Sequence, residues 1–283
     1  SDCEIILRLY EKNGPSCVSR LDGVFSFVLY DEEKKQLMVG RDPYGVRPLY
    51  MCYYKNKNIG FSSDIKPLLF DKNIEKIYNF EAGTYALFNY NNEERFWYMS
   101  HHERYYFNTS YIPIVQHETK VRPIEYYMHT FVEKMKESVQ KRVNNCERDI
   151  ACLLSGGLDS GIVSALVNRM YKEKTGNVLE TYSIGLNNAS DFEFAKKMSQ
   201  HIGSKHHEII VSNDDFIKSI PDVIRDIESY DTTTVRASVG NWNIGKYIAE
   251  HSNAKVVFNG DGSDELAGGY LYFNACPSDQ AFH

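Results

Sequence analysis

The 283-residue chain lacks several features that would place it in a particular class of protein. It has no run of about 18 apolar residues that could cross a membrane, and no positive-then-apolar leader opens it. Its basic residues form no stripe, and its formal charge of −6 is mild and spread out. These absences argue against a membrane protein or a nucleic-acid partner and leave small-molecule substrates open. The cytosol is the expected compartment.

Cysteine is present but forms no recognisable pattern. The six cysteines show no C-x-x-C pair or other metal spacing, so we expect scattered, mostly buried thiols in a reducing compartment. They are Cys3, Cys17, Cys52, Cys146, Cys152 and Cys276. None of them heads the chain. The chain starts at Ser1, inside a helix-like segment, and stops soon after a glycine-rich motif. We therefore expect an internal piece of a larger protein, with processing or a truncated reading frame as alternatives.

The first hundred residues are rich in short β-prone runs. Runs at 23–30 and 36–40 flank a charged turn and predict a hairpin. Further runs at 49–54 and 59–62 are expected to extend it into one antiparallel sheet. A polar, aromatic segment from about Ser100 to Arg122 suits a long connection between domains.

The pattern then changes to alternating helices and strands. A helix is expected over 124–143, with Tyr127, Phe131, Met135 and Val139 along one face. Strands are expected at 150–154, 179–186, 208–211 and 255–258, and helices at 161–171, 191–202, 214–228 and around 239–251. This alternation predicts a parallel sheet with right-handed crossovers, whose ligands bind beyond the carboxyl ends of the strands.

The residues 151–161 form the most informative segment, because an apolar strand leads into a small-residue loop and then a helix. Gly156 and Gly157 allow the backbone to approach an anion, and the following helix start attracts it. Asp159 could hold Mg²⁺ against phosphates. The Walker lysine and spacing are absent. The Ser155–Ser160 string resembles the PP-loop of ATP pyrophosphatases, whereas a bare glycine turn would not require the Asp-Ser pair.

A second loop, residues 259–270, falls after the last predicted strand. It gathers Asp261, Asp264 and Glu265 between glycines, which predicts a Mg²⁺ ion and an ammonium-bearing group as partners. A solvated acidic turn is the alternative. Between the two loops, Arg236 could clamp a phosphate or carboxylate by paired hydrogen bonds, although a surface arginine after a threonine-rich turn is common.

Together these segments resemble the glutamine-hydrolysing asparagine synthetase family over nearly the whole chain. The matching segments are 1–4, 21–27, 41–50, 153–160, 232–238 and 262–270. The resemblance implies an α+β, Ntn-type glutaminase part with an antiparallel sheet, followed by an α/β PP-loop ATP pyrophosphatase domain with a parallel sheet. The implied boundaries are residues 1–105 for the later portion of the class II glutamine amidotransferase domain, 106–123 for a linker and 124–283 for a truncated synthetase domain.

The resemblance also implies residue roles. ATP would contact Leu153, Ser155, Gly156, Gly157, Asp159, Ser160, Ile184, Asn259 and Gly260. The family pattern places Mg²⁺ at Asp159 and Asp264, glutamine at Asp2, and the aspartate substrate at Glu265 and Tyr270. Asp261, Arg236 and Glu265 would carry the catalytic roles, with Arg236 stabilising phosphate charge.

Two departures separate the chain from the family pattern. The family's glutaminase nucleophile is an amino-terminal Cys, and its other glutamine-fixing elements lie upstream of anything present, so the chain as written is expected to lack glutaminase activity. Asp261 occupies a position where the family usually carries Glu, proposed to take a proton as ammonia attacks. Aspartate reaches about one C–C bond less far, and ~1 Å of misplacement can cost ~100-fold in rate.

The predicted activity is the ATP-dependent amidation of aspartate to asparagine through a β-aspartyl-AMP intermediate, with release of AMP and pyrophosphate. The expected partners are aspartate, glutamine or ammonia, and ATP with Mg²⁺; a homodimer is left open. Two alternatives stand beside this reading: a β-lactam-synthetase-like amide ligase and a non-catalytic nucleotide-binding remnant. Nucleotide binding without asparagine formation would favour the remnant.

Overall fold

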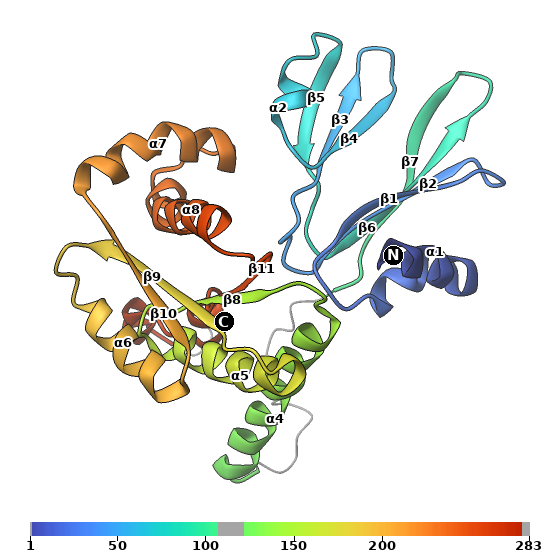
Figure 1. The fold of residues 1–283 in the computed structure, drawn as a ribbon. Helices are drawn as coiled ribbons and strands as arrows, with labels where there is room; N and C mark the ends of the chain where they lie inside the picture. The colour runs from blue at the N-terminus through green and yellow to red at the C-terminus, as the bar shows by residue number, and fades with distance from the viewer. Residues whose placement is uncertain (1, 107–121, 279–283) are drawn as a thin grey trace. The chain divides into compact units, whose positions relative to one another are not determined.

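A computed structural model describes residues 2–106 and 122–278, without the side chain of Asp2. The chain divides into two compact units, residues 1–112 and 113–283. Figure 1 labels their helices and strands. No helix within the described ranges is long and apolar enough to cross a membrane.

Unit 1 contains two antiparallel sheets and a helix at its start. The chain runs through α1 (Asp2–Asn13), a 3-10 segment (Gly14–Arg20) and β1 (Ser26–Asp31), β2 (Gln36–Arg41), β3 (Tyr50–Tyr54) and β4 (Ile59–Ser62). It continues through α2 (Lys66–Leu69), β5 (Ile74–Asn79), β6 (Thr84–Asn91) and β7 (Phe96–Arg104). One sheet has the order β1-β2-β6-β7, and the other has the order β4-β3-β5.

The predicted hairpin of β1 and β2 is confirmed, but the expectation that β3 and β4 extend the same sheet is wrong. The reason is a buried corner after β2. The Asp42 carboxylate accepts hydrogen bonds from three backbone N–H groups within residues 44–47, at 2.9–3.1 Å. The Arg41 guanidinium donates to the carbonyls of Gly45, Arg47 and Phe80. This corner directs the chain into the second sheet, and β6 pairs with β2 instead.

The expected connection beginning at Ser100 is also corrected, because β7 continues to Arg104 in antiparallel register with β6. Residues 107–121 of that connection lie outside the described residues.

Unit 2 has the predicted alternation of helices and strands. Its elements are α4 (Ile124–Asn145), β8 (Ile150–Leu153), α5 (Leu158–Thr175), β9 (Glu180–Leu186), α6 (Asp191–Ile202), β10 (Lys205–Val211), α7 (Asn213–Ile227), α8 (Thr232–His251), β11 (Val256–Phe258), α9 (Ser263–Ala267) and a 3-10 turn (Leu271–Ala275). The strands form one sheet in the order β10-β9-β8-β11, and every pairing is parallel. The predicted parallel sheet is therefore confirmed.

Helices cover both faces of this sheet (Figure 1). On one face, α4 and α5 pack on β8 through a cluster that includes Val143, Val167 and Cys152, each with 0% exposure. On the other face, α8 packs through Ile244 and Ile248 against Tyr182 of β9. Buried apolar surface on both faces explains why these strands read as continuous apolar runs.

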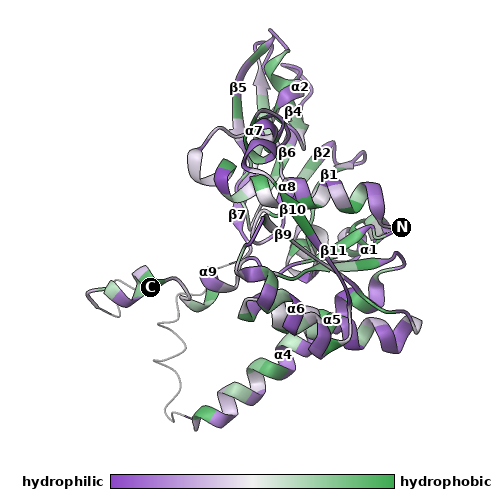
Figure 2. Cartoon of the chain, turned by 60° about the vertical axis from the view of Figure 1, so that its left-hand side comes forward, coloured by the Kyte–Doolittle hydropathy of each residue, from purple (hydrophilic) through white to green (hydrophobic). Residues whose placement is uncertain are grey.

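The predicted apolar stripe of α4 is only partly buried. Val139 is buried, whereas Phe131 is 63% exposed and Tyr127 is 41% exposed. Figure 2 shows apolar positions along α4 as far as its outer end. The cause is that α4 contributes only Val139 and Val143 to the buried cluster with α5 and β8, so the remaining stripe has no such packing.

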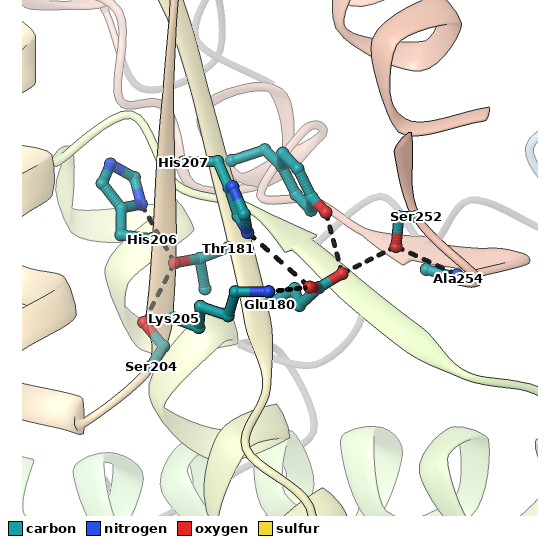
Figure 3. Close-up of polar contacts among 9 residues, drawn as sticks. Glu180, Thr181, Ser204, Lys205, His206, His207, Ser252 and Ala254 are labelled. Carbon is teal, nitrogen blue, oxygen red and sulfur yellow. Dashed lines mark hydrogen bonds and ion pairs between the residues drawn. The ribbon is translucent and has the colours of Figure 1, made fainter. Parts of the chain in front are cut away.

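The amino-terminal edge of the parallel sheet is joined by a network around Glu180 (Figure 3). Its carboxylate accepts hydrogen bonds from Ser252 at 2.7 Å, Tyr182 at 2.8 Å and Lys205 at 2.9 Å. Burial by itself would raise the pKa of Glu180, but these hydrogen bonds outweigh burial and hold that pKa at about 2. The ring of His207 stacks on Tyr182 with centroids 4.7 Å apart. One carboxylate thus connects β9, β10 and the segment before β11.

Candidate functional site

The first loop follows β8 at the carboxyl edge of the sheet. Pairing with β9 continues one residue beyond β8, because the backbone N–H of Leu154 donates a hydrogen bond to the carbonyl of Tyr182 at 2.8 Å. Gly156 then adopts φ +88°, in the region that favours glycine. A Cβ at this position would lie 2.5 Å from the backbone nitrogen of Ala195 and 2.6 Å from Cβ of Phe194, both in α6. The loop requires glycine here for its conformation and for its contact with α6.

Two serine hydroxyls hold the curvature of this loop. The Ser155 and Ser160 hydroxyls lie 3.0 Å apart, and the Ser160 hydroxyl also accepts from the backbone N–H of Ser155 at 3.3 Å. It donates to the carbonyl of Gly157 at 3.2 Å. Ser160 is buried, with 8% exposure, whereas Ser155 is exposed. The buried Ser160 hydroxyl therefore holds the loop conformation, and the exposed Ser155 lies on the solvent side of the loop.

The helix after this loop presents backbone donors. Gly157 is the N-cap of the 18-residue α5, and no side chain caps this end. The first N–H groups of a helix have no intrahelical partner and carry partial positive charge, which favours an anion. Together with the positive-φ glycine, this end has the local structure of a phosphate-binding loop. Asp159 lies in the first turn and is partly exposed.

The second loop lies directly against the first. β11 pairs in parallel with β8, so both strands end at the same edge. A Cβ at Gly260 would lie 2.7 Å from the backbone nitrogen of Ser160 and 3.0 Å from Cβ of Asp159. The two predicted loops are thus brought into contact, and only a residue without Cβ leaves room for it.

The acidic residues of the second loop lie in and before the short helix α9. The Asp261 carboxylate accepts a hydrogen bond from the Asn259 side-chain amide at 2.7 Å. Asp264 and Glu265 are in the first turn of α9, and Glu265 accepts a hydrogen bond from the Tyr270 hydroxyl at 2.6 Å. This bond lowers the pKa of Glu265 and is the main reason that the pKa of Tyr270 rises to about 12. Glu265 is thus an exposed carboxylate whose position is fixed by Tyr270.

Leu153 and Ile184 lie on adjacent strands and face the α8 side of the sheet, where both pack around its buried cluster. A Cβ at Gly240 of α8 would be 4.0 Å from Ile184 Cγ2, near the carboxyl end of β9. Arg236 lies one turn before Gly240 and is exposed. Since α8 runs back across the sheet to β11, its start lies at the carboxyl edge, on the side of both loops.

The start of α8 corrects the expected helix around 239–251. The helix begins at Thr232, because Asp231 is its N-cap and accepts hydrogen bonds from the backbone N–H and hydroxyl of Thr234, both at 2.8 Å. The threonine-rich segment is therefore the first helical turn. The Asp-x-x-Thr spacing was the available signal for this cap.

A divalent cation would have few protein ligands at this site. In the described parts of the chain, no group of three His, Cys, Asp or Glu residues could hold a metal ion. Mg²⁺ is commonly held by one or two carboxylates together with substrate phosphates and water. Asp159 and Asp264 lie in the first turns of the two helices that follow the touching loops. This donor set fits Mg²⁺ that arrives with a nucleotide.

Asp2, expected to bind glutamine, has a side chain outside the described residues, and it belongs to unit 1. The close contact of Gly156 with Phe194 and Ala195 was not predicted from the sequence. Nothing in the local sequence around these residues signals that contact, because it depends on how α6 packs beside α5.

The fold and the loops define an α/β domain whose carboxyl edge carries a glycine loop followed by an uncapped helix start. Residues 130–282 match the family model described as asparagine synthase, and residues 1–127 match that of a glutamine amidotransferase domain. The chain belongs to the asparagine synthase family. Its antiparallel unit and its parallel unit correspond to the expected Ntn-type glutaminase and PP-loop folds, so the predicted fold class is confirmed.

Curated relatives support this assignment. The chain is 36% identical over 292 residues to the glutamine-hydrolysing asparagine synthetase of Homo sapiens and 35% identical over 302 residues to that of Bos taurus. Each match covers 99% of the chain, which spans about half (51%) of the relative. Among solved structures, the NH3-dependent NAD synthetase from Campylobacter jejuni has a TM-score of 0.35 and 21% identity, over 50% of this chain and 60% of that one.

Proposed function

We propose that the chain takes part in the ATP-dependent amidation of aspartate to asparagine with glutamine as nitrogen donor. The overall reaction converts ATP, aspartate, glutamine and water into asparagine, AMP, pyrophosphate and glutamate. The observation that carries the proposal is the contact of the two loops at Gly260 and Ser160, which brings an anion-binding helix start beside an acidic loop. Membership of the asparagine synthase family supports the same chemistry.

In the first step, ATP binds at the loop 155–160, with Leu153, Ile184, Asn259 and Gly260 at its adenosine. The β-carboxylate of aspartate attacks the α-phosphorus, forming β-aspartyl-AMP and releasing pyrophosphate. Activation is needed because a carboxylate has no usable leaving group. Mg²⁺ held by Asp159 and Asp264 would neutralise charge on the phosphates. Arg236 would add a guanidinium to the same phosphates.

In the second step, ammonia attacks the acyl carbon and AMP leaves. Asp261 would accept a proton from the attacking nitrogen. Glu265, which accepts a hydrogen bond from Tyr270, would bind the ammonium of aspartate. Glutamine would supply the ammonia, with Asp2 at its α-amino end.

We infer that residues 1–105 form the glutaminase domain and that residues 124–283 form the synthetase domain. We also propose the cytosol as the compartment, because six scattered cysteines without a metal-binding spacing suit a reducing environment.

The test is aspartate-dependent pyrophosphate release with ammonium as nitrogen donor. Asp159→Asn should abolish release, because it removes one of two metal carboxylates. Asp214→Asn, which changes an exposed carboxylate at the start of α7, is the matched control and should leave release unchanged. Equal release by wild type and Asp159→Asn would remove the metal role of Asp159. ATP binding without any asparagine formation would favour a nucleotide-binding remnant, and a cyclised product would favour a β-lactam-synthetase-like ligase.

A further inference from the structure

A cleft in unit 1 lies between its two sheets, and none of the residues given a role above lines it. It encloses about 420 Å³ and is bordered by β5, β7 and the end of the β3–β4 hairpin. Six of its lining residues are aromatic: Tyr53, Tyr54, Tyr78, Phe96, Trp97 and Tyr98. Small-molecule sites typically enclose roughly 300–1,000 Å³ and are lined by such side chains.

Pairs of rings form the two walls of this cleft. Tyr53 of β3 and Tyr78 of β5 meet edge to face, with ring centroids 5.9 Å apart. Phe96 and Tyr98 lie two residues apart on β7, so they share one face of the strand, and their ring centroids are 6.3 Å apart. Tyr78 and Tyr98 keep 44% and 45% of their surface exposed, whereas Trp97 is partly buried and packs against the core between the sheets. The walls thus present ring surface that unit 1 itself does not cover.

Two lysines give the cleft a positive rim. Lys57 adopts φ +64° in the β3–β4 turn, and its ammonium lies 5.3 Å from the Phe96 ring centroid on the opposite wall. Lys76 lines the cleft from β5, next to Glu75, so the rim carries two positive charges and one negative charge. Among the described residues, no carboxylate forms an ion pair with either lysine. The ammonium groups are therefore available to an anionic ligand.

We infer that this cleft binds a planar aromatic ring that carries an anionic group, with a purine nucleoside monophosphate as the representative ligand. The ring would stack between the tyrosine and phenylalanine walls, which favour offset or edge-to-face contact with another ring. The anionic group would pair with Lys57 and Lys76 by charge-assisted hydrogen bonds. This cleft belongs to unit 1, whereas the proposed ATP site belongs to unit 2, and the inference does not depend on the proposed reaction.

Intrinsic fluorescence can report on this cleft alone, because the chain contains only two tryptophans. In Trp242→Phe, the remaining reporter is Trp97 in the cleft. Titration with AMP should change the emission of Trp97. The affinity for adenosine and the affinity for inorganic phosphate should each be at least about tenfold lower than that for AMP, because adenosine lacks the anionic group and phosphate lacks the ring. In Trp97→Phe, the remaining tryptophan is Trp242 in unit 2, so its emission records any binding of AMP to unit 2 separately from binding to the cleft.

Lys57→Gln should lower the affinity of the cleft for AMP about tenfold, as recorded by Trp97 emission, and leave the affinity for adenosine unchanged. Lys57→Arg should restore most of the affinity. Lys72→Gln, an exposed lysine outside the cleft, is the matched control and should behave as wild type. The inference is overturned if Trp97 emission does not respond to AMP, or if Lys57→Gln and Lys72→Gln have the same affinity. Adenosine binding as tightly as AMP would also overturn it, because the lysines would then play no part.

Discussion

At the amino-terminal edge of the parallel sheet, charged and hydroxyl side chains hold the strands together, whereas at the carboxyl edge the loops touch through glycine. Glu180 connects three segments at the first edge. At the second edge, Gly156 meets α6 and Gly260 meets the start of α5. The difference separates two tasks. Side-chain bonds stabilise one edge, and bare backbone at the other leaves N–H groups free to meet a ligand.

The largest expected effect comes from adding a Cβ at Gly156, where the loop contacts α6. Gly156→Ala would place a Cβ 2.5 Å from the Ala195 nitrogen at φ +88°, so α6 or the loop must move. We expect pyrophosphate release to fall by at least about 100-fold, since ~1 Å of misplacement can cost that much. The free energy of unfolding should also fall by about 1–3 kcal/mol.

Gly176→Ala separates crowding from backbone strain. Gly176 has a similar φ of +75°, but a Cβ there meets nothing within 4 Å. It lies at the end of α5, at the other end from the loop. This variant should lose stability through its backbone alone and keep its pyrophosphate release. Equal losses of release in the two variants would show that the contact with α6 is not what Gly156 provides.

Asp261 tests whether the carboxyl edge also performs proton transfer. Asp261→Glu should raise asparagine formation per pyrophosphate released, by as much as ~100-fold if reach limits the step. Asp261→Asn should uncouple the two products, because an amide cannot accept the proton. Both products are measured together with ammonium as nitrogen donor. A ratio that neither substitution changes would identify Asp261 as a loop residue bonded to Asn259, without a catalytic role.

Glu180 tests the opposite edge. Its pKa is lowered from 4.5 to about 2 in the folded protein, so its ionised form stabilises the fold at pH values above about 4.5. That stability is lost as the pH falls from about 4.5 towards 2. Glu180→Gln should lower the free energy of unfolding at neutral pH by about 1–3 kcal/mol and flatten its acid dependence, without changing the KM for ATP.

Glu193→Gln is the matched control for Glu180, measured by chemical denaturation at several pH values. Glu193 pairs with Lys197 at 2.6 Å, but both side chains are mostly exposed and screened by solvent, so this variant should lose much less stability than Glu180→Gln. If both variants lose the same stability, the network around Glu180 adds nothing beyond a surface ion pair. A changed KM for ATP in Glu180→Gln would mean that the two edges are coupled.

The sequence was sufficient for local features and insufficient for tertiary ones. The strand, glycine loop and helix around Gly156 were predictable because each leaves a signal within a few residues. The sheet that β3 joins was not, because the buried bonds of Arg41 and Asp42 decide it. The backing of Gly156 by α6 was likewise invisible, since packing of one helix on another leaves no local motif.

The smallest expected effect concerns Tyr270, whose hydroxyl bonds Glu265 at the carboxyl edge of the sheet. Tyr270→Phe removes the hydroxyl that bonds Glu265 at 2.6 Å but keeps the ring that stacks on Tyr272. The pKa of Glu265 should rise, because that hydrogen bond is the main cause of its lowering. We expect the KM for aspartate to increase by roughly two- to fivefold, with kcat nearly unchanged, since an exposed hydrogen bond contributes little. Tyr272→Phe, which leaves Glu265 bonded, is the control and should retain the wild-type KM. An increase in the KM for ATP rather than for aspartate would place Glu265 at the nucleotide and withdraw its proposed role at the aspartate ammonium.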